Sequence, residues 1–255
     1  MAAPRAAAEG PAARPRVLAA WSETASEHFA ARHEEADAED AAGVLELLEA
    51  TRARLARAFA VVPAGVDVIL HGSDAQLLIA RPGLVLERAV AAPAARRYVT
   101  GTWSRRELHV LAPRRLEERA SAVPGSRELV LLSPACLYAR LVVGSSSRAL
   151  RSRRRARRAA WLAWGAAEWF SGQTAHARPA IARRLREGRP PAFPPGRRDA
   201  RLLGGTVIDL LVCERGEAEA VRLVDEGVLR HAFGGAPLRE IDARWRAHLD
   251  RLTGV

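Results

Sequence analysis

Two apolar segments in the middle of the chain restrict its fold more than any other part of the sequence. Cys136–Val143 is an apolar run that follows Pro134, and Ala159–Phe170 is a second apolar run that stops at Gly172. Proline is favoured in the first turn of a helix and glycine just after its end, so both runs are predicted to be helices. Their apolar character means that both helices have to be buried in a core.

The first half of the chain is expected to supply a small sheet. Glu27–Arg32 alternates as a strand does, and Asp37–Phe59 carries apolar residues at helical spacing. Val66–Leu70 is a short apolar run typical of a buried strand, which completes a β-α-β opening. Arg97–Trp103 and Glu107–Leu111 are expected to form a hairpin.

The second half is expected to be mostly helical. Further helices are predicted at Leu202–Glu214, Glu217–Glu226 and Leu238–Leu252, and the proline-rich stretch Gly188–Gly196 is expected to be a loop. We therefore predict an α+β fold in which a small mixed β-sheet with helices precedes a mostly helical C-terminal half.

Length and composition suggest one globular unit. Residues 1–20, rich in Ala, Pro and Arg, are predicted to be a disordered tail. Residues 21–255 are expected to form a single domain, with a β-rich lobe at 21–125 and a helical lobe at 126–255. The sequence shows no apolar signal-peptide core and no apolar run of about 18 residues, and two cysteines are too few for a disulfide framework. We expect a soluble, cytoplasmic protein without a transmembrane segment.

Four segments, in this order, resemble the gluzincin zinc metallopeptidases, and more narrowly the peptidase-MA-like proteins. They are SEHFAARHE (26–34), ELHVLAP (107–113), WLAWGAAEWFSG (161–172) and LREIDARWRAHL (238–249). The third segment is the most specific, since it resembles the family pattern Trp-Leu-x-Glu-Gly-x-Ala-Glu-Tyr that supplies the third zinc ligand. The resemblance covers roughly residues 21–252 and implies a gluzincin-like (zincin) domain.

The residues that hold zinc in that family are replaced. The family motif His-Glu-x-x-His places two imidazoles on one helix face, and it aligns here with Cys136-Leu137-Tyr138-Ala139-Arg140. Cys136 and Arg140 stand at the two histidine positions, Leu137 at the general-base position and Trp164 at the third ligand. Zinc activates water by lowering its pKa from about 15.7 to about 7. We therefore expect no zinc cofactor and no peptidase activity, although the family uses zinc.

Arg140 needs a partner if it points where the second histidine would point, because a buried unpaired charge is costly. Glu168 lies four residues after Trp164, on nearly the same helix face. We predict an Arg140–Glu168 ion pair, with Trp164 and Leu137 as apolar filling, in place of the metal. The alternative is that Arg140 extends to solvent.

An active zinc-dependent metallopeptidase whose ligands lie elsewhere is the main alternative. No two of the seven histidines are three or four residues apart. His33 and Asp37 imitate the spacing of the motif, but a solvated turn entering a helix explains them better. In this alternative, the search for ligands starts from His28, His33 and His109.

The arginines of the chain suggest a third function. The net charge of +11 comes from arginine alone, because the chain contains no lysine. A dense run between the two apolar segments is a candidate anion-binding surface. Its candidate residues are Arg151, Arg153, Arg154, Arg155, Arg157 and Arg158. Nucleic acid is an improbable partner, because few aromatic residues accompany these arginines.

A peptide or protein segment is the partner we expect. In related peptidases the strand before the zinc helix is an exposed edge that pairs with extended substrate, and Arg106–Leu111 occupies that place here. Leu108 and Val110 are the candidate peptide-edge residues. An inactive relative of the family would then keep a peptide-binding or scaffold role.

Overall fold

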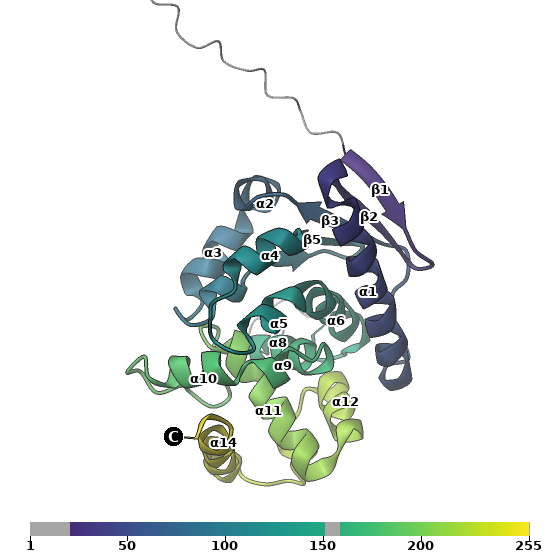
Figure 1. The fold of residues 1–255 in the computed structure, drawn as a ribbon. Coiled ribbons are helices and arrows are strands. Elements are labelled where there is room, and N and C mark those ends of the chain that lie inside the picture. Colours follow the sequence, from purple (N-terminus) through teal and green to yellow (C-terminus); the bar gives the residue numbers. More distant parts are fainter. Residues whose placement is uncertain (1–20, 151–158, 255) are drawn as a thin grey trace, which may run out of the picture.

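The computed structural model describes residues 21–150 and 159–254 and has the α+β architecture expected from the sequence (Figure 1). Its sheet is mixed and five-stranded, with the order β1-β2-β3-β5-β4. The strands are β1 (Trp21–Ala25), β2 (Phe29–Glu34), β3 (Val66–His71), β4 (Gly101–Trp103) and β5 (Glu107–Leu111). The three central strands run parallel, and β1 and β4 pair antiparallel with β2 and β5 at the two edges.

Helices pack on the sheet and continue below it in a helical half (Figure 1). Helix α1 (Ala38–Ala58) connects β2 to β3, and α6 (Ser133–Ser146) packs on the sheet through an edge-to-face contact between Tyr138 and Phe29. Helix α2 (Asp74–Ala80) follows β3 and packs against β3 and β5. The remaining helices are α3 (Gly83–Val90), α4 (Pro113–Arg119), α5 (Ser126–Leu131), α8 (Ala160–Phe170), α9 (Gln173–His176), α10 (Arg178–Leu185), α11 (Ala200–Arg215), α12 (Glu217–Glu226), α13 (Leu229–Ala232) and α14 (Leu238–Thr253).

The main elements agree with the sequence prediction. The helix expected at 37–59 is α1, and Pro134 lies in the first turn of α6. The expected hairpin is β4–β5, but its first strand begins only at Gly101, because Arg96–Tyr98 forms a 3-10 helix. Both apolar runs are buried, and their side chains belong to one hydrophobic cluster that also includes the sheet. None of the helices in the described ranges is long and apolar enough to span a membrane. The predicted tail, residues 1–20, lies outside the described residues.

The peptide-edge prediction for Leu108 and Val110 is wrong. Strand β5 lies between β3 and β4, and both side chains are fully buried, with 0% exposure. The hairpin places β4 outside β5, with Gly101 opposite Val110 and Trp103 opposite Leu108. The open edge on this side of the sheet therefore belongs to β4.

Two glycines let α8 and α11 approach each other at backbone distance. A Cβ atom added to Gly165 would lie 2.9 Å from the Cα atom of Gly204, and one added to Gly204 would lie 2.5 Å from the carbonyl oxygen of Trp161. Both contacts involve backbone, which cannot rotate away as a side chain can. The crossing therefore requires glycine at both positions.

Alanine at this crossing should destabilise the fold. We expect Gly165→Ala and Gly204→Ala each to lower the free energy of unfolding by about 2 kcal/mol or more, because the two helices must separate. Gly43→Ala in α1 is the matched control, since nothing lies within 4 Å of its added Cβ. That variant should gain about 0.5–1 kcal/mol through helix propensity. Urea unfolding of the three variants measures the difference, and similar effects at all three positions would contradict the close approach.

Candidate functional site

The residues at the expected ligand positions come together where α6, α8 and β4 meet. Cys136, Leu137 and Trp164 are buried, with 3%, 2% and 8% exposure. The Cδ1 atom of Leu137 lies 2.7 Å from where a Cβ of Gly101 would be, so Leu137 fills the space under the edge strand. The sequence therefore identified a real cluster of side chains, but the cluster is packed with apolar groups.

The Cys136 thiol is unreactive in this setting. Burial, together with the nearby charge of Glu168, raises its pKa to about 12. Its side chain hydrogen-bonds with Ser171. Because only the thiolate is a good nucleophile or metal ligand, this thiol does neither at neutral pH.

Arg140 lies between two tryptophans. Its guanidinium carbon is 4.5 Å from the ring centroid of Trp103 and 5.6 Å from that of Trp164, both within cation–π range. Its Nε atom is buried without a hydrogen-bond partner among the described residues, and burial lowers the pKa of the group to about 10. The predicted ion pair with Glu168 is not formed, and the side chain is not simply extended into solvent either.

Glu168 is instead the cap of another helix. Its two carboxylate oxygens accept from the backbone N–H of Leu202, at 2.9 and 3.1 Å, and it also accepts from the backbone of Gly205. The chain kinks at Leu202, which has a φ of +82°, and the regular part of α11 starts after it. Asp199, the nearest residue of a capping type, is already paired with Arg184. The carboxylate on α8 therefore satisfies the free N–H groups of α11.

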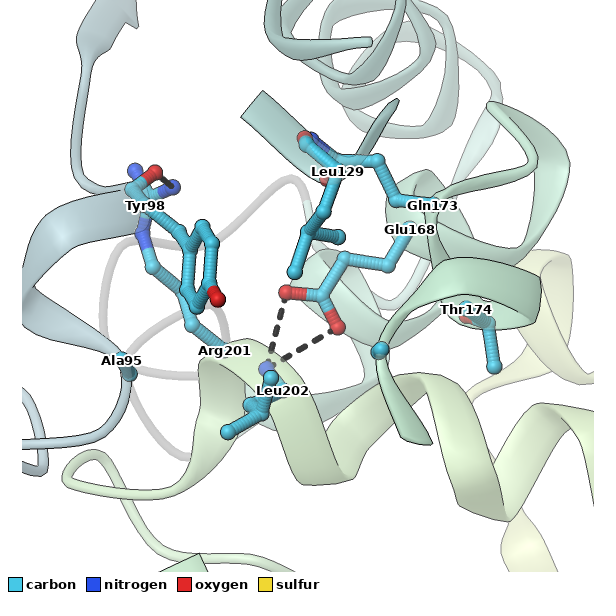
Figure 2. A pocket seen from close by; sticks show the side chains of 9 residues that line it. Ala95, Tyr98, Leu129, Glu168, Gln173, Thr174, Arg201 and Leu202 are labelled. Atoms are coloured by element: carbon cyan, nitrogen blue, oxygen red, sulfur yellow. Dashed lines mark hydrogen bonds between the residues drawn. The ribbon is translucent and has the colours of Figure 1, made fainter. Parts of the chain in front are cut away.

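A small cavity of about 20 Å³ opens beside this carboxylate. Figure 2 shows Glu168 directed at Leu202, with Tyr98 on one side of the cavity and Thr174 on the other. Burial raises the pKa of Glu168 to about 7, because the two backbone hydrogen bonds and the charge of Arg201 offset desolvation only in part. The volume suits about one water molecule. The arrangement can hold or release one proton near neutral pH.

Tyr98, Trp103, Arg201 and Leu202 belong to this region but were not found from the sequence. They lie outside the four motif segments, and none stands in a recognisable motif. Only the Gly204–Gly205 pair next to Leu202 suggests close backbone contact at this place.

The histidines of the alternative assignment lie apart. His28 binds Glu49 at 2.8 Å, and His33 binds Thr24 at 2.9 Å. His109 pairs with His71 at 3.0 Å on the sheet. Within residues 21–150 and 159–254, no group of three or more histidine, cysteine or acidic side chains is placed to hold a metal ion. The arginine run at 151–158 lies outside the described residues.

The pKa of Glu168 predicts how stability depends on pH. The pKa of Glu168 in the folded state, about 7, exceeds the ordinary value of 4.5, so the folded state binds the proton more tightly than the unfolded state. The stability that this proton contributes is lost as pH rises from about 4.5 to about 7. Glu168→Gln keeps an acceptor for Leu202 but cannot titrate. Relative to wild type, the free energy of unfolding of this variant should rise by on the order of 3 kcal/mol across that interval.

Wild type and Glu168→Gln have to be compared, because His71 changes the free energy of unfolding with pH in the opposite direction to Glu168. Burial lowers the pKa of His71 from 6.5 to about 4, so its contribution to stability increases with pH over nearly the same interval. Urea unfolding of both proteins at several pH values cancels this effect in the difference. A difference that stays constant from pH 4.5 to 7.5 would show that Glu168 titrates normally.

Comparisons with known proteins give no relative for this chain. No family model, no curated protein and no solved structure matches it. The resemblance to gluzincins is carried by the four sequence segments, and the site has to be interpreted from its own geometry.

Proposed function

We propose that this chain is a peptide-binding protein with a gluzincin-like architecture and without peptidase chemistry. The observation that supports this proposal is the set of side chains that occupy the expected zinc site. Leu137 packs under the edge strand, Arg140 lies against two tryptophans, and Glu168 caps α11. A permanently charged guanidinium at a ligand position repels a divalent cation, and no described side chain there supplies a nucleophile.

The edge of β4 is the proposed peptide-binding element. Ser104 N–H donates to Glu107 O at 2.8 Å, and Leu111 N–H donates to Thr100 O at 3.2 Å. In an antiparallel pair such bonds involve every second residue, so the backbone groups of Trp103 face away from β5. Among the described strands, none pairs with β4 on that side. An extended peptide can add there as a sixth strand.

A short edge sets a limit on affinity. Strand β4 has three residues, so it offers few backbone hydrogen bonds, each contributing about 1 kcal/mol net. Specific binding therefore needs side-chain contacts beside the strand. The Trp103 ring, which meets Trp164 edge to face at 5.1 Å, connects the strand to the surface of α8.

A pair of variants at one position tests this mode of binding. Peptides would first be selected against the full-length protein from a random ten-residue display library. Trp103→Ala removes the ring but keeps the backbone N–H, whereas Trp103→Pro removes both. Proline is tolerated at a sheet edge where the N–H faces solvent. We expect the proline variant to bind the selected peptides about tenfold more weakly than the alanine variant, measured by calorimetry.

Two results would contradict the proposal. One is equal affinity of the alanine and proline variants, which would show that the outward N–H of residue 103 takes no part. The other is a library that yields no peptide with affinity above that of its scrambled version. Far-ultraviolet circular dichroism of both variants provides the folding control.

A further inference from the structure

A second, larger cavity lies beside the tryptophan that replaces the third zinc ligand. It has a volume of about 230 Å³ and is bordered by α3, α8 and the segment leading into α11. Its charged lining consists of Arg197, Arg198 and Arg201 against one carboxylate, Glu87. Trp164 forms one of its walls. The cavity therefore has an excess of positive charge.

The guanidinium groups of Arg198 and Arg201 have more N–H donors than they have hydrogen-bond acceptors among the described residues. Arg201 lies flat on Trp164, with its Cζ atom 3.4 Å from the ring centroid, and it makes long contacts of 3.3 Å to Glu87 and 3.4 Å to the carbonyl of Tyr98. Arg198 pairs with Glu187 at 3.1 Å, but its Nε atom is buried without a partner among the described residues. An arginine carries five N–H donors, so the contacts made with described residues leave several donors of these groups without an acceptor.

Arg197 is the third arginine of the lining, and one further arginine, Arg140, adds to the excess of positive charge. Arg197 is exposed and makes no hydrogen bond or ion pair with another described residue. Arg140 lies behind the Trp164 wall, and its charge and that of Arg201 repel each other. Glu87 and Glu187 offset only part of this positive charge, so a bound anion would stabilise the group.

The remaining lining defines the kind of anion. Val90, Ala91 and Ala160 give the cavity an apolar side that a fully hydrated inorganic ion would not use. The volume is below the 300–1,000 Å³ or so of pockets for drug-sized ligands. It suits a carboxylate on a short aliphatic stem, with the carboxylate at the arginines and the stem against the apolar side and Trp164.

We infer that this cavity binds a carboxylate on a short aliphatic stem, and that an acidic side chain or the C-terminus of a peptide on β4 carries it. The identity of the carrier rests on the proposed function, because Trp103 on β4 contacts Trp164 at the cavity wall. Arginine suits this role, since its planar fork binds a carboxylate through two parallel hydrogen bonds.

Small probes test the cavity without any peptide. Sodium pentanoate carries both the charge and the stem, pentanamide carries the stem alone, and inorganic phosphate carries charge alone. At constant ionic strength, pentanoate at ten times its Kd should raise the thermal unfolding midpoint of the full-length protein by about 3–5 °C. Pentanamide and phosphate at the same concentrations should shift the midpoint by less than about 1 °C.

Variants locate the effect. Arg197→Met and Arg201→Met should each weaken pentanoate binding by about tenfold, followed by tryptophan fluorescence. Arg197 has no described partner, so its loss leaves folding intact even if Arg201→Met perturbs the start of α11. Arg57→Met on α1, an exposed arginine outside the cavity, is the matched control and should bind within about twofold of wild type.

The results test the carboxylate site in the cavity separately from the claim that a peptide carries the carboxylate. Equal shifts by pentanoate and pentanamide, stronger binding of phosphate, or unchanged affinity in both cavity variants would overturn the carboxylate site. The selected peptides test the carrier: enrichment of Glu, Asp or a free C-terminus that is lost with Arg197→Met supports it. Peptides that need the N–H of residue 103 but show no acidic preference would overturn this inference and leave the proposed function standing.

Discussion

The hydrogen bonds between the buried carboxylate of Glu168 and the start of α11 hold this part of the structure in place. They connect Glu168 on α8 to the backbone of Leu202, 34 residues later in the chain. Leu202 lies at the kink near the start of α11 and has a left-handed backbone conformation. Such a conformation costs on the order of 1–3 kcal/mol and persists only when its surroundings impose it. The Gly165–Gly204 crossing brings the two helices close enough for this contact. Arg201, which lies on Trp164, is the other non-helical residue of the kink.

The Glu168 cap and the Gly165–Gly204 crossing give a structural explanation for the motif that resembles the family pattern. The pattern that the third segment resembles is kept at Trp161, Leu162, Gly165, Ala167 and Glu168, and the sequence departs from it at Trp164 and Trp169. Two of the kept residues have a structural role, Gly165 in the helix crossing and Glu168 in the cap. Trp164 is an aromatic surface for two guanidinium groups, those of Arg140 and Arg201. The scaffold is therefore explained without a metal, and the local charge favours anions.

The sequence predicted the longer helices and most of the strands, but it missed short helices such as α2, α3, α4 and α10, and it predicted the contacts between elements poorly. The apolar runs and their proline and glycine boundaries indicate α6 and α8, because these signals are local. Strand β1 was not predicted, since its residues are at most half-buried and show no apolar alternation. The position of β5 inside the sheet could not be predicted from its own residues, because it depends on which strand of the hairpin pairs with β3 and which forms the edge. Glu168 was assigned to Arg140 because helix spacing shows which face a residue is on, but not which distant backbone N–H needs an acceptor.

Metal analysis of the purified protein tests the central claim most directly. The account predicts less than about a tenth of an equivalent of zinc by elemental analysis, and the same thermal unfolding midpoint with and without a chelator, because the cap and the helix crossing connect the helices in place of a metal. Near-stoichiometric zinc together with a midpoint that falls on chelation would contradict it. The cluster around Cys136, Arg140 and Trp164 would then not be the altered metal site.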